Sequence, residues 1–404
     1  MDKNRKTELY EFYKSCLLED CIPFWLNHSL DHEYGGYFTC LDREGKVFST
    51  DKSVWFQGRG LWIYSRLCNA LGKRDEWLEA ARLGYEFLVN YCFDTDGRMF
   101  FQVTRDGKPL RKRRYLFSET FAIIALAEYY KATGNMAALD KAKSIYKMIL
   151  SIYDNPANDP YKITPKVYSE TRAMKAMAVP MILLNTNYIL REIDNVNCKC
   201  SGNACDCSVN YADIAKMLTK EIIEDFLKPE EKALFETVGI NGEKLDTPAG
   251  RCINPGHSIE ASWFLMKEAE YQKDTGLMQK ALNILDWSLD LGWDKEYGGI
   301  SYYADIEGKP IEQLEWDMKL WWPHTEALYA LLLAYKNTDK QKYLDWYDKV
   351  HNYTFDRFPD KEYGEWYGYL HRDGTVSHTL KGSMWKGPFH IPRALLFCMQ
   401  LLED

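Results

Sequence analysis

Residues 31–46, DHEYGGYFTCLDREGK, combine an acidic turn, paired glycines, alternating aromatic side chains and a second turn that ends in Glu-Gly-Lys. Alternating side chains around tight glycine turns are typical of a short β-hairpin. The same plan recurs in three further stretches: DTDGRMFFQVTRDGKP at 94–109, DKEYGGISYYADIEGKP at 294–310 and DKEYGEWYGYLHRDGTV at 360–376. A unit that recurs along a chain indicates a repeat architecture.

The four copies begin 63, 200 and 66 residues apart, and 200 is close to three such steps. Two degraded copies are therefore expected in the gap, at residues 159–168 and 234–244. Segments between copies, such as 117–131 and 321–335, carry helical periodicity. One repeat has room for two ordinary helices and a hairpin. Six repeats predict an (α/α)6 barrel, an all-α fold with short β-hairpins in its connecting loops, which forms one domain over residues 1–404.

Composition narrows the class of protein. The chain has 404 residues, of which 46% are hydrophobic and 27% charged, and it predicts a folded protein with a large core. A net charge of -8 disfavours binding to nucleic acid, which needs basic surface. We find neither a secretion signal nor an apolar run of the ~20 residues that span a membrane. We therefore expect a cytoplasmic location and no membrane partner.

The eleven cysteines favour reduced thiols over a disulfide framework. Four of them form two Cys-x-Cys pairs between Cys198 and Cys207. Because this spacing differs from the usual Cys-x2-Cys zinc pattern, we expect an ordinary solvated loop and no metal site, with metal capture as the alternative.

Familiar cofactor motifs are missing from the sequence. It contains no G-x-G-x-x-G, no G-x4-G-K-[ST], no H-E-x-x-H and no G-x-S-x-G. Acid–base chemistry that needs no cofactor is therefore the leading enzyme hypothesis.

Three histidines share a local pattern that suggests such chemistry. Each follows or adjoins a Pro at an expected helix start, and each has a charged residue two or three positions on: His257 with Glu260, His324 with Glu326, and His390 with Arg393. Arg59 opens another apolar helix in the same relative place. If these are inner helices, their polar residues meet around one cleft. Aromatic side chains at that mouth, including Trp322, suit the apolar faces of a sugar ring.

At these residues the chain resembles the N-acylglucosamine 2-epimerase family, also called the renin-binding protein family. The matching blocks run along nearly the whole chain: WFQGR at 55–59, AVPM at 178–181, NPGHSIEASWFL at 254–265, QLEWDMKLWWPHTEA at 313–327, EYGEW at 362–366 and KGPFHIPR at 386–393. The resemblance implies an (α/α)6 barrel, a homodimer, and interconversion of N-acetyl-D-glucosamine and N-acetyl-D-mannosamine. Met181 stands where cellobiose epimerases and mannose isomerases of the superfamily have a histidine, which favours the N-acyl sugar branch.

Two features separate this chain from the animal members. Pro388 stands where they have a cysteine, so a required thiol at that position is not expected here. The family is described as stimulated by ATP, which would make ATP an allosteric effector and not a cofactor of the chemistry. The sequence has no P-loop, and the basic residues 111–114 are expected to be a solvated hairpin.

The chemistry of C2 epimerisation assigns roles to these side chains. Inversion of a carbon centre needs proton donors on opposite faces, so we assign His257 and His390 as the acid–base pair. The resemblance and its charge assign Arg59 to the developing enolate oxygen. Glu260 is expected to orient His257. The residues expected to bind the sugar are Glu260 as well as Glu326, Arg393, His324 and Trp322.

Three other readings remain open. The chain could be a sister enzyme, a cellobiose 2-epimerase or a mannose isomerase. It could be a glycoside hydrolase or lyase with Glu260 and Glu326 as its paired carboxylates. It could also be a non-catalytic barrel that binds another protein.

Overall fold

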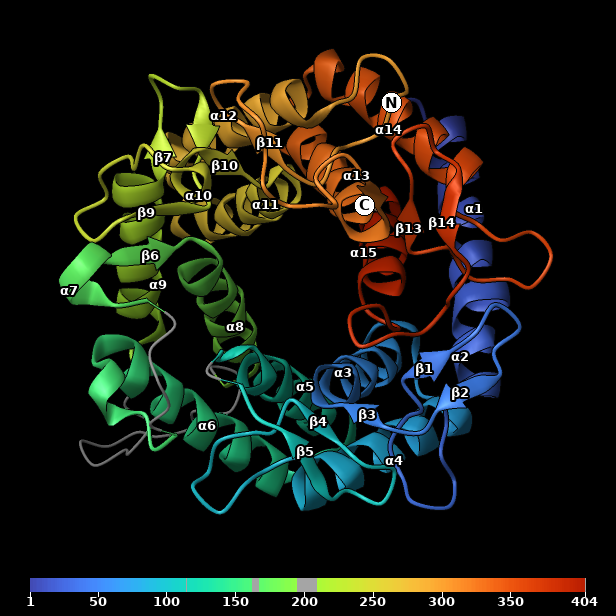
Figure 1. Cartoon of the computed structure of the whole chain (residues 1–404). Helices are drawn as coiled ribbons and strands as arrows, with labels where there is room; N and C mark the ends of the chain where they lie inside the picture. The colour runs from blue at the N-terminus through green and yellow to red at the C-terminus, as the bar shows by residue number, and fades with distance from the viewer. Residues whose placement is uncertain (114, 162–166, 195–208, 404) are drawn as a thin grey trace.

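Two concentric rings of helices form the molecule (Figure 1). The computed structural model describes residues 1–113, 115–161, 167–194 and 209–403. The inner ring consists of α3 (Val54–Leu71), α5 (Phe117–Thr133), α8 (Ala178–Asp194), α11 (Pro255–Gln272), α13 (Trp321–Thr338) and α15 (His390–Glu403). The outer ring consists of α1 (Lys3–Ser15), α4 (Asp75–Tyr91), α6 (Met136–Asp154), α9 (Tyr211–Glu221), α12 (Thr275–Gly292) and α14 (Gln341–Arg357). The predicted six helix pairs and the barrel are confirmed.

The sequences of the two rings explain their positions. Inner helix α5 buries side chains on every side, including the polar Glu119 and Glu128. Outer helix α6 buries one stripe, which includes Leu139, Tyr146 and Ile149, and turns its lysines outward. A helix that is apolar all round belongs in a core, whereas an amphipathic helix covers one.

The sixth helix pair joins the two ends of the chain. Each of the other inner helices is followed along the sequence by its outer partner, but α15 ends the chain and packs against α1. The ring then closes between α15 and α3, where the rings of Phe397 and Trp62 lie 6.1 Å apart. The barrel is therefore completed only when the first and last helices meet.

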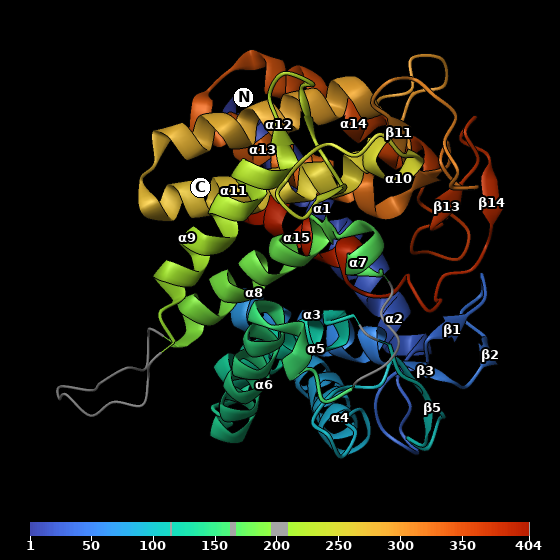
Figure 2. The ribbon, with the colours of Figure 1, turned by 60° about the vertical axis from the view of Figure 1, so that its left-hand side comes forward.

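Short strands gather at one end of the barrel (Figure 2). Their bounds are β1 Cys40–Leu41, β2 Val47–Ser49, β3 Lys52–Ser53, β4 Gln102–Val103, β5 Pro109–Arg111, β6 Met174–Ala176, β7 Leu227–Lys228, β8 Ala233–Leu234, β9 Thr237–Gly239, β10 Cys252–Ile253, β11 Ala304–Asp305, β12 Lys319–Leu320, β13 Tyr369–Leu370 and β14 Val376–His378. They pair antiparallel in the orders β1–β2, β3–β4–β5, β6–β9, β7–β8, β10–β11 and β12–β13–β14. Strands β3 and β12 lead directly into the inner helices α3 and α13. The hairpins therefore mark the end of the barrel at which the inner helices begin.

The two degraded repeats are recovered to different extents. In residues 234–244 the backbone N–H of Gly239 donates to the carbonyl of Glu243 (2.8 Å), which is the expected turn. In residues 159–168 the carboxylate of Asp159 pairs with Arg98, and residues 162–166 lie outside the described part of the chain.

The first Asp of three repeats accepts from two cations. A buried lysine and an arginine from the hairpin of the next repeat donate to Asp31 (Lys52 and Arg105, 2.9 Å each), to Asp294 (Lys319 at 3.0 Å and Arg372 at 2.8 Å) and to Asp360 (Lys381 at 2.9 Å and Arg43 at 2.8 Å). Burial raises the pKa of Asp31, but Arg105 and Lys52 outweigh it and lower that pKa to about 2. These ionised aspartates fasten each hairpin to its neighbour.

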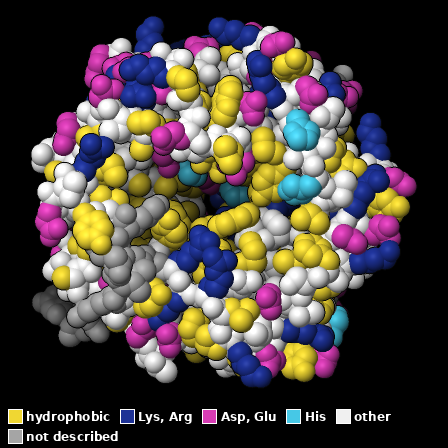
Figure 3. All heavy atoms as spheres, in the orientation of Figure 1, with side chains coloured by type: hydrophobic (Ala, Val, Ile, Leu, Met, Phe, Trp, Pro, Cys, Tyr) yellow, Lys and Arg dark blue, Asp and Glu magenta, His cyan; other side chains and the backbone are white. Residues whose placement is uncertain are grey.

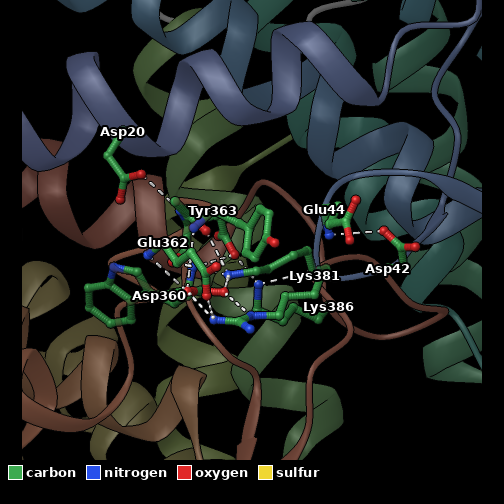
Figure 4. Close-up of polar contacts among 12 residues, drawn as sticks. Asp20, Asp42, Glu44, Asp360, Glu362, Tyr363, Lys381 and Lys386 are labelled. Atoms are coloured by element: carbon green, nitrogen blue, oxygen red, sulfur yellow. Dashed lines mark hydrogen bonds and ion pairs between the residues drawn. The ribbon is translucent and has the colours of Figure 1, made fainter.

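The ion pairs of Asp360 connect the last repeat to the first and so close the ring. Asp360 belongs to the last repeat and Arg43 to the first, so this ion pair joins segments at opposite ends of the sequence. Figure 4 shows Asp360 beside the buried Lys381, with Lys386 below. The repeat pattern therefore continues across the point at which the chain begins and ends.

The cysteines of the described residues are free thiols, as predicted, namely Cys16, Cys21, Cys40, Cys68, Cys92, Cys252 and Cys398. The segment from Cys198 to Cys207, where a loop without metal was expected, lies outside the described residues. No described helix combines the length and the apolar character needed to cross a bilayer.

Candidate active site

The predicted site residues meet where the inner helices begin. His257 and His390 lie in the first turns of α11 and α15, Arg59 in the second turn of α3, and Trp322 in the first turn of α13. In Figure 3, which looks along the barrel axis, histidine side chains are visible inside a central hollow with hydrophobic side chains around its rim. The structure thus brings together residues that are more than 300 positions apart in the sequence.

His390 is held from behind by a carboxylate. Its Nδ1 donates to Oε1 of Glu326 at 2.8 Å. The same Glu326 accepts from the guanidinium of Arg393 (2.6 Å) and from Nε1 of Trp263 (2.9 Å). Because all three donors are buried and converge on one carboxylate, this network fixes both the orientation and the tautomer of the imidazole.

His257 has a different carboxylate partner from the one expected. Its Nδ1 lies 3.0 and 3.1 Å from the two oxygens of Glu236, and its backbone N–H donates to the side chain of Asn254 (3.0 Å). Glu260, which was expected to orient His257, instead accepts from Arg393 at 2.7 Å. Sequence reasoning missed Glu236 because it lies in a degraded repeat, on a different element from His257, and no spacing rule links the two.

The surroundings shift the pKa values of the two imidazoles in opposite directions. Burial lowers the pKa of His257, but the charge and hydrogen bond of Glu236, together with Glu260, outweigh it, so the pKa is raised above 6.5. Burial lowers the pKa of His390 well below 6.5, and the nearby cations Arg393 and Arg59 lower it further. Of the two imidazoles, His257 therefore holds a proton more strongly than His390.

One aromatic ring lies close to both histidines. The ring of Trp322 is 5.1 Å from that of His257 and 5.9 Å from that of His390, measured between centroids. Its edge faces Tyr302 at 6.2 Å. Trp322 is therefore placed to form one wall for a substrate held between the imidazoles.

Arg59 is a buried cation without a carboxylate partner among the described residues. Its Nη1 donates to the backbone carbonyl of Trp385 (3.0 Å), and its Nε has no acceptor in that part of the chain. The guanidinium lies over the ring of Phe121 at 4.2 Å. Burial, followed by repulsion from Arg393, lowers its pKa to about 9. A desolvated guanidinium with a spare donor is suited to an oxyanion.

His324 does not belong to this group, which corrects the expectation that it binds the sugar. Its side chain is fully buried. One ring nitrogen accepts from the backbone N–H of Ile300 (2.9 Å), and the other donates to the carbonyl of Leu320 (2.7 Å). Burial lowers the pKa of His324 to about 3. Because both of its nitrogens are occupied by backbone groups, the residue links a hairpin to the start of α13 and has no nitrogen left for a substrate.

The ion pairs of Glu260 and Glu326 bear on two possible roles, metal binding and glycoside hydrolysis. Together with His390 they place three ligand atoms within 4.8 Å of one another, a spacing that could hold a metal ion. The guanidinium of Arg393 already donates to both carboxylates. Because both carboxylates bind this one guanidinium, neither is free to act on a glycosidic bond as the paired carboxyls of a glycoside hydrolase do. The hydrolase reading is therefore unfavourable.

Solved structures with the same fold define the class of protein. The cellobiose 2-epimerase of Bacillus thermoamylovorans superimposes with a TM-score of 0.83 at 24% identity, covering 98% of this chain and 99% of that one. A D-mannose isomerase superimposes with a TM-score of 0.80 at 16% identity, covering 97% of each chain. The chain thus has the helical-barrel fold found in sugar epimerases and isomerases.

Comparison of sequences narrows the class to one family. The family model for N-acylglucosamine 2-epimerase (GlcNAc 2-epimerase) matches residues 36–391. The N-acylglucosamine 2-epimerase of Rattus norvegicus is 38% identical over 411 aligned positions, covering 100% of this chain and 94% of the rat protein. The chain belongs to the N-acylglucosamine 2-epimerase family and is an isomerase-class enzyme.

Proposed function

We propose that this enzyme interconverts N-acetyl-D-glucosamine and N-acetyl-D-mannosamine by moving the proton at C2 of the open-chain sugar. The carrying observation is the pair of imidazoles close to Trp322, each with its own carboxylate, Glu236 or Glu326, at Nδ1. The full-length likeness to the rat enzyme supports the amino sugar as substrate.

The substrate dictates the kind of catalysis. Removal of the C2 proton requires the C1 aldehyde of the opened ring, because only the carbonyl stabilises the resulting carbanion as an enolate. Carbon 2 carries nitrogen, so the enolate cannot form a ketose by simple tautomerisation. Return of a proton to C2 is then the productive exit, and its face decides which epimer forms.

Two separately held imidazoles meet this requirement. The Nε2 atoms of His257 and His390 have no hydrogen-bond partner among the described residues, while both Nδ1 atoms face carboxylates. One Nε2 takes the C2 proton, and the C–H electron pair moves into the enolate. The other imidazolium returns a proton to the opposite face of C2, which inverts the centre.

The resting charges assign the first step. His390 is the neutral base because burial, Arg393 and Arg59 lower its pKa. His257 carries the proton because Glu236 outweighs burial and raises its pKa. One epimer is therefore deprotonated by His390 and reprotonated by His257, and the other epimer uses the reverse order after the proton has moved between the imidazoles.

Arg59 completes the proposed site. Negative charge develops on O1 as the C2 proton leaves, and the spare donors of the buried Arg59 stabilise it. Arg393 remains tied to Glu260 and Glu326, so its first task is to hold the carboxylate that orients His390.

Proton NMR in deuterium oxide tests the proposal directly. Purified enzyme with N-acetyl-D-mannosamine should yield N-acetyl-D-glucosamine with deuterium at C2. If neither product nor exchange appears, the proposed substrate is wrong, and turnover of mannose or cellobiose would then identify a sister activity. The same assay with and without ATP tests the expected effector, and light scattering of the purified enzyme tests the expected homodimer.

A further inference from the structure

A second cavity lies on the barrel axis, at the end away from the histidines. Its volume is about 210 Å³, and each of the six inner helices contributes to its lining, through Arg66, Glu128, Tyr188, Lys267, Tyr329 and Gln400. These residues occupy the later turns of the helices whose first turns carry the active site. The cavity is therefore at the end of the barrel opposite the hairpins, where α15 ends (Figure 2).

The two sites share a wall that is one layer of side chains thick. Trp263 and Arg393 line the cavity, and both donate to Glu326, the carboxylate behind His390. Phe389, the residue before His390, completes this wall. An occupant of the cavity would thus lie beside the residues that position the catalytic imidazole.

Several polar groups that line the cavity lack partners. The hydroxyl of Tyr329 and the amide of Asn185 make no hydrogen bond to any described residue, although these residues are only 8% and 5% exposed. Nε of Arg66 is buried without an acceptor in the described chain, which costs free energy. The Tyr329 hydroxyl and the Asn185 amide line the cavity with unused hydrogen-bonding capacity, so the three groups together suit an occupant that both donates and accepts.

The charges around the cavity favour a neutral occupant. Glu128 accepts from Arg66 (3.3 Å) and Asn69 (2.7 Å), Lys267 pairs with Glu270 (2.7 Å), and the carboxylates already described hold Arg393. Glu192, which also lines the cavity, accepts from the hydroxyl of Tyr188. A charged ligand would have to break one of these pairs, whereas a neutral hydroxyl would not.

The walls and the size favour a single sugar ring. Six aromatic side chains line the cavity, namely Trp62, Tyr188, Trp263, Tyr329, Phe389 and Phe397. Aromatic faces pack against the C–H faces of a pyranose while polar groups bind its hydroxyls. The volume is about seven times the ~30 Å³ share of one water and below the ~300–1,000 Å³ typical of drug-sized ligands.

We propose that the cavity at the end of the barrel opposite the hairpins is a second binding site. It would hold a neutral ligand of monosaccharide size through Asn185, Tyr329 and Arg66, between aromatic walls. This site is separate from the one that performs epimerisation and does not depend on the identity of the epimerisation substrate.

Methyl glycosides provide the probe, because they cannot open to the aldehyde and are not turned over. We would measure binding of the methyl glycosides of glucose, mannose, galactose and N-acetylglucosamine by saturation-transfer NMR and calorimetry. Wild-type enzyme is expected to bind at least one of them saturably. The double variant Asn185→Leu/Tyr329→Phe, which removes polar atoms while keeping side-chain bulk, is expected to bind at least tenfold more weakly.

Two controls place the ligand. Asn90→Leu/Tyr271→Phe makes the same changes at exposed positions and should bind as wild type. Trp322→Ala alters the wall of the active site and should leave binding in the second cavity intact. If the double variant does not fold, Gln400→Trp, which fills the cavity from its edge, takes its place. Absence of saturable binding by all four glycosides would overturn the proposal, as would binding lost in Trp322→Ala but kept in the cavity variants.

Discussion

The substitution Glu326→Gln is expected to separate the chemistry of the site from its stability. It keeps the shape of the side chain and removes its charge and one acceptor oxygen. In the native enzyme Oε1 accepts from His390 and Arg393, and Oε2 accepts from Trp263. A glutamine has one oxygen, so whichever way the amide turns, its NH2 group faces at least one buried donor.

The magnitude follows from these bonds. The less damaging orientation keeps the amide oxygen toward His390 and Arg393 and leaves the N–H of Trp263 unpaired, which costs about 1–3 kcal/mol. Replacing a charged acceptor by a neutral one weakens the bond to Arg393 by about 1 kcal/mol more. Because Arg393 keeps Glu260, the total stays near or below the ~3–5 kcal/mol of a fully broken buried pair. We expect a loss of about 2–4 kcal/mol in the free energy of unfolding.

Catalysis should suffer more than stability. The amide oxygen still accepts from Nδ1 of His390 but no longer supplies the negative charge that stabilises the imidazolium, and kcat is expected to fall by about 10²–10⁴-fold, the usual contribution of a positioned general base. Turnover is followed by NMR of the N-acetylated sugars, and stability by urea unfolding.

A matched control lies on the same inner ring. Glu268 of α11 is also buried and accepts from Arg191 (3.1 and 2.7 Å) and Gln272 (2.7 Å), away from the histidines. Glu268→Gln should lose comparable stability and keep its kcat. If Glu326→Gln kept kcat within threefold of wild type, the role of Glu326 in holding His390 would be refuted.

Three further predictions follow from other contacts. Glu236→Gln should move the alkaline limb of the kcat/KM profile to lower pH, because it removes the charge that raises the pKa of His257; an unmoved limb would exclude that role. Arg43→Ala should lower the free energy of unfolding, measured in urea at neutral pH, below that of wild type. Since Arg43 helps hold the pKa of Asp360 below its usual value, this difference should shrink as pH falls below about 4, and a pH-independent difference would argue against the ion pair. His324→Phe should cost about 2–4 kcal/mol by unpairing two backbone groups, yet keep kcat per folded molecule; a large fall in kcat would restore it to the active site.

Much of the architecture could be predicted because repetition is visible in one dimension. Hairpin units at regular intervals, with helical periodicity between them, were enough to predict six helix pairs and the barrel. The first turns of inner helices converge at one end of a barrel, so the meeting of His257, His390 and Arg59 also followed from the pattern. The sequence could not show which helix would pair with α1, since that partner lies at the other end of the chain.

The partners of individual side chains were decided by the tertiary structure. His324 and His390 have similar local sequences, but Ile300 of the hairpin 294–310 and Leu320 of β12 occupy the two nitrogens of His324, while His390 keeps one nitrogen free. Glu260 lies one helical turn from His257, yet the inner-ring geometry turns it toward Arg393 and leaves His257 to Glu236. Local sequence determines where helices and turns begin because those depend on near neighbours, whereas hydrogen-bond partners and burial depend on which segments the closed ring brings side by side.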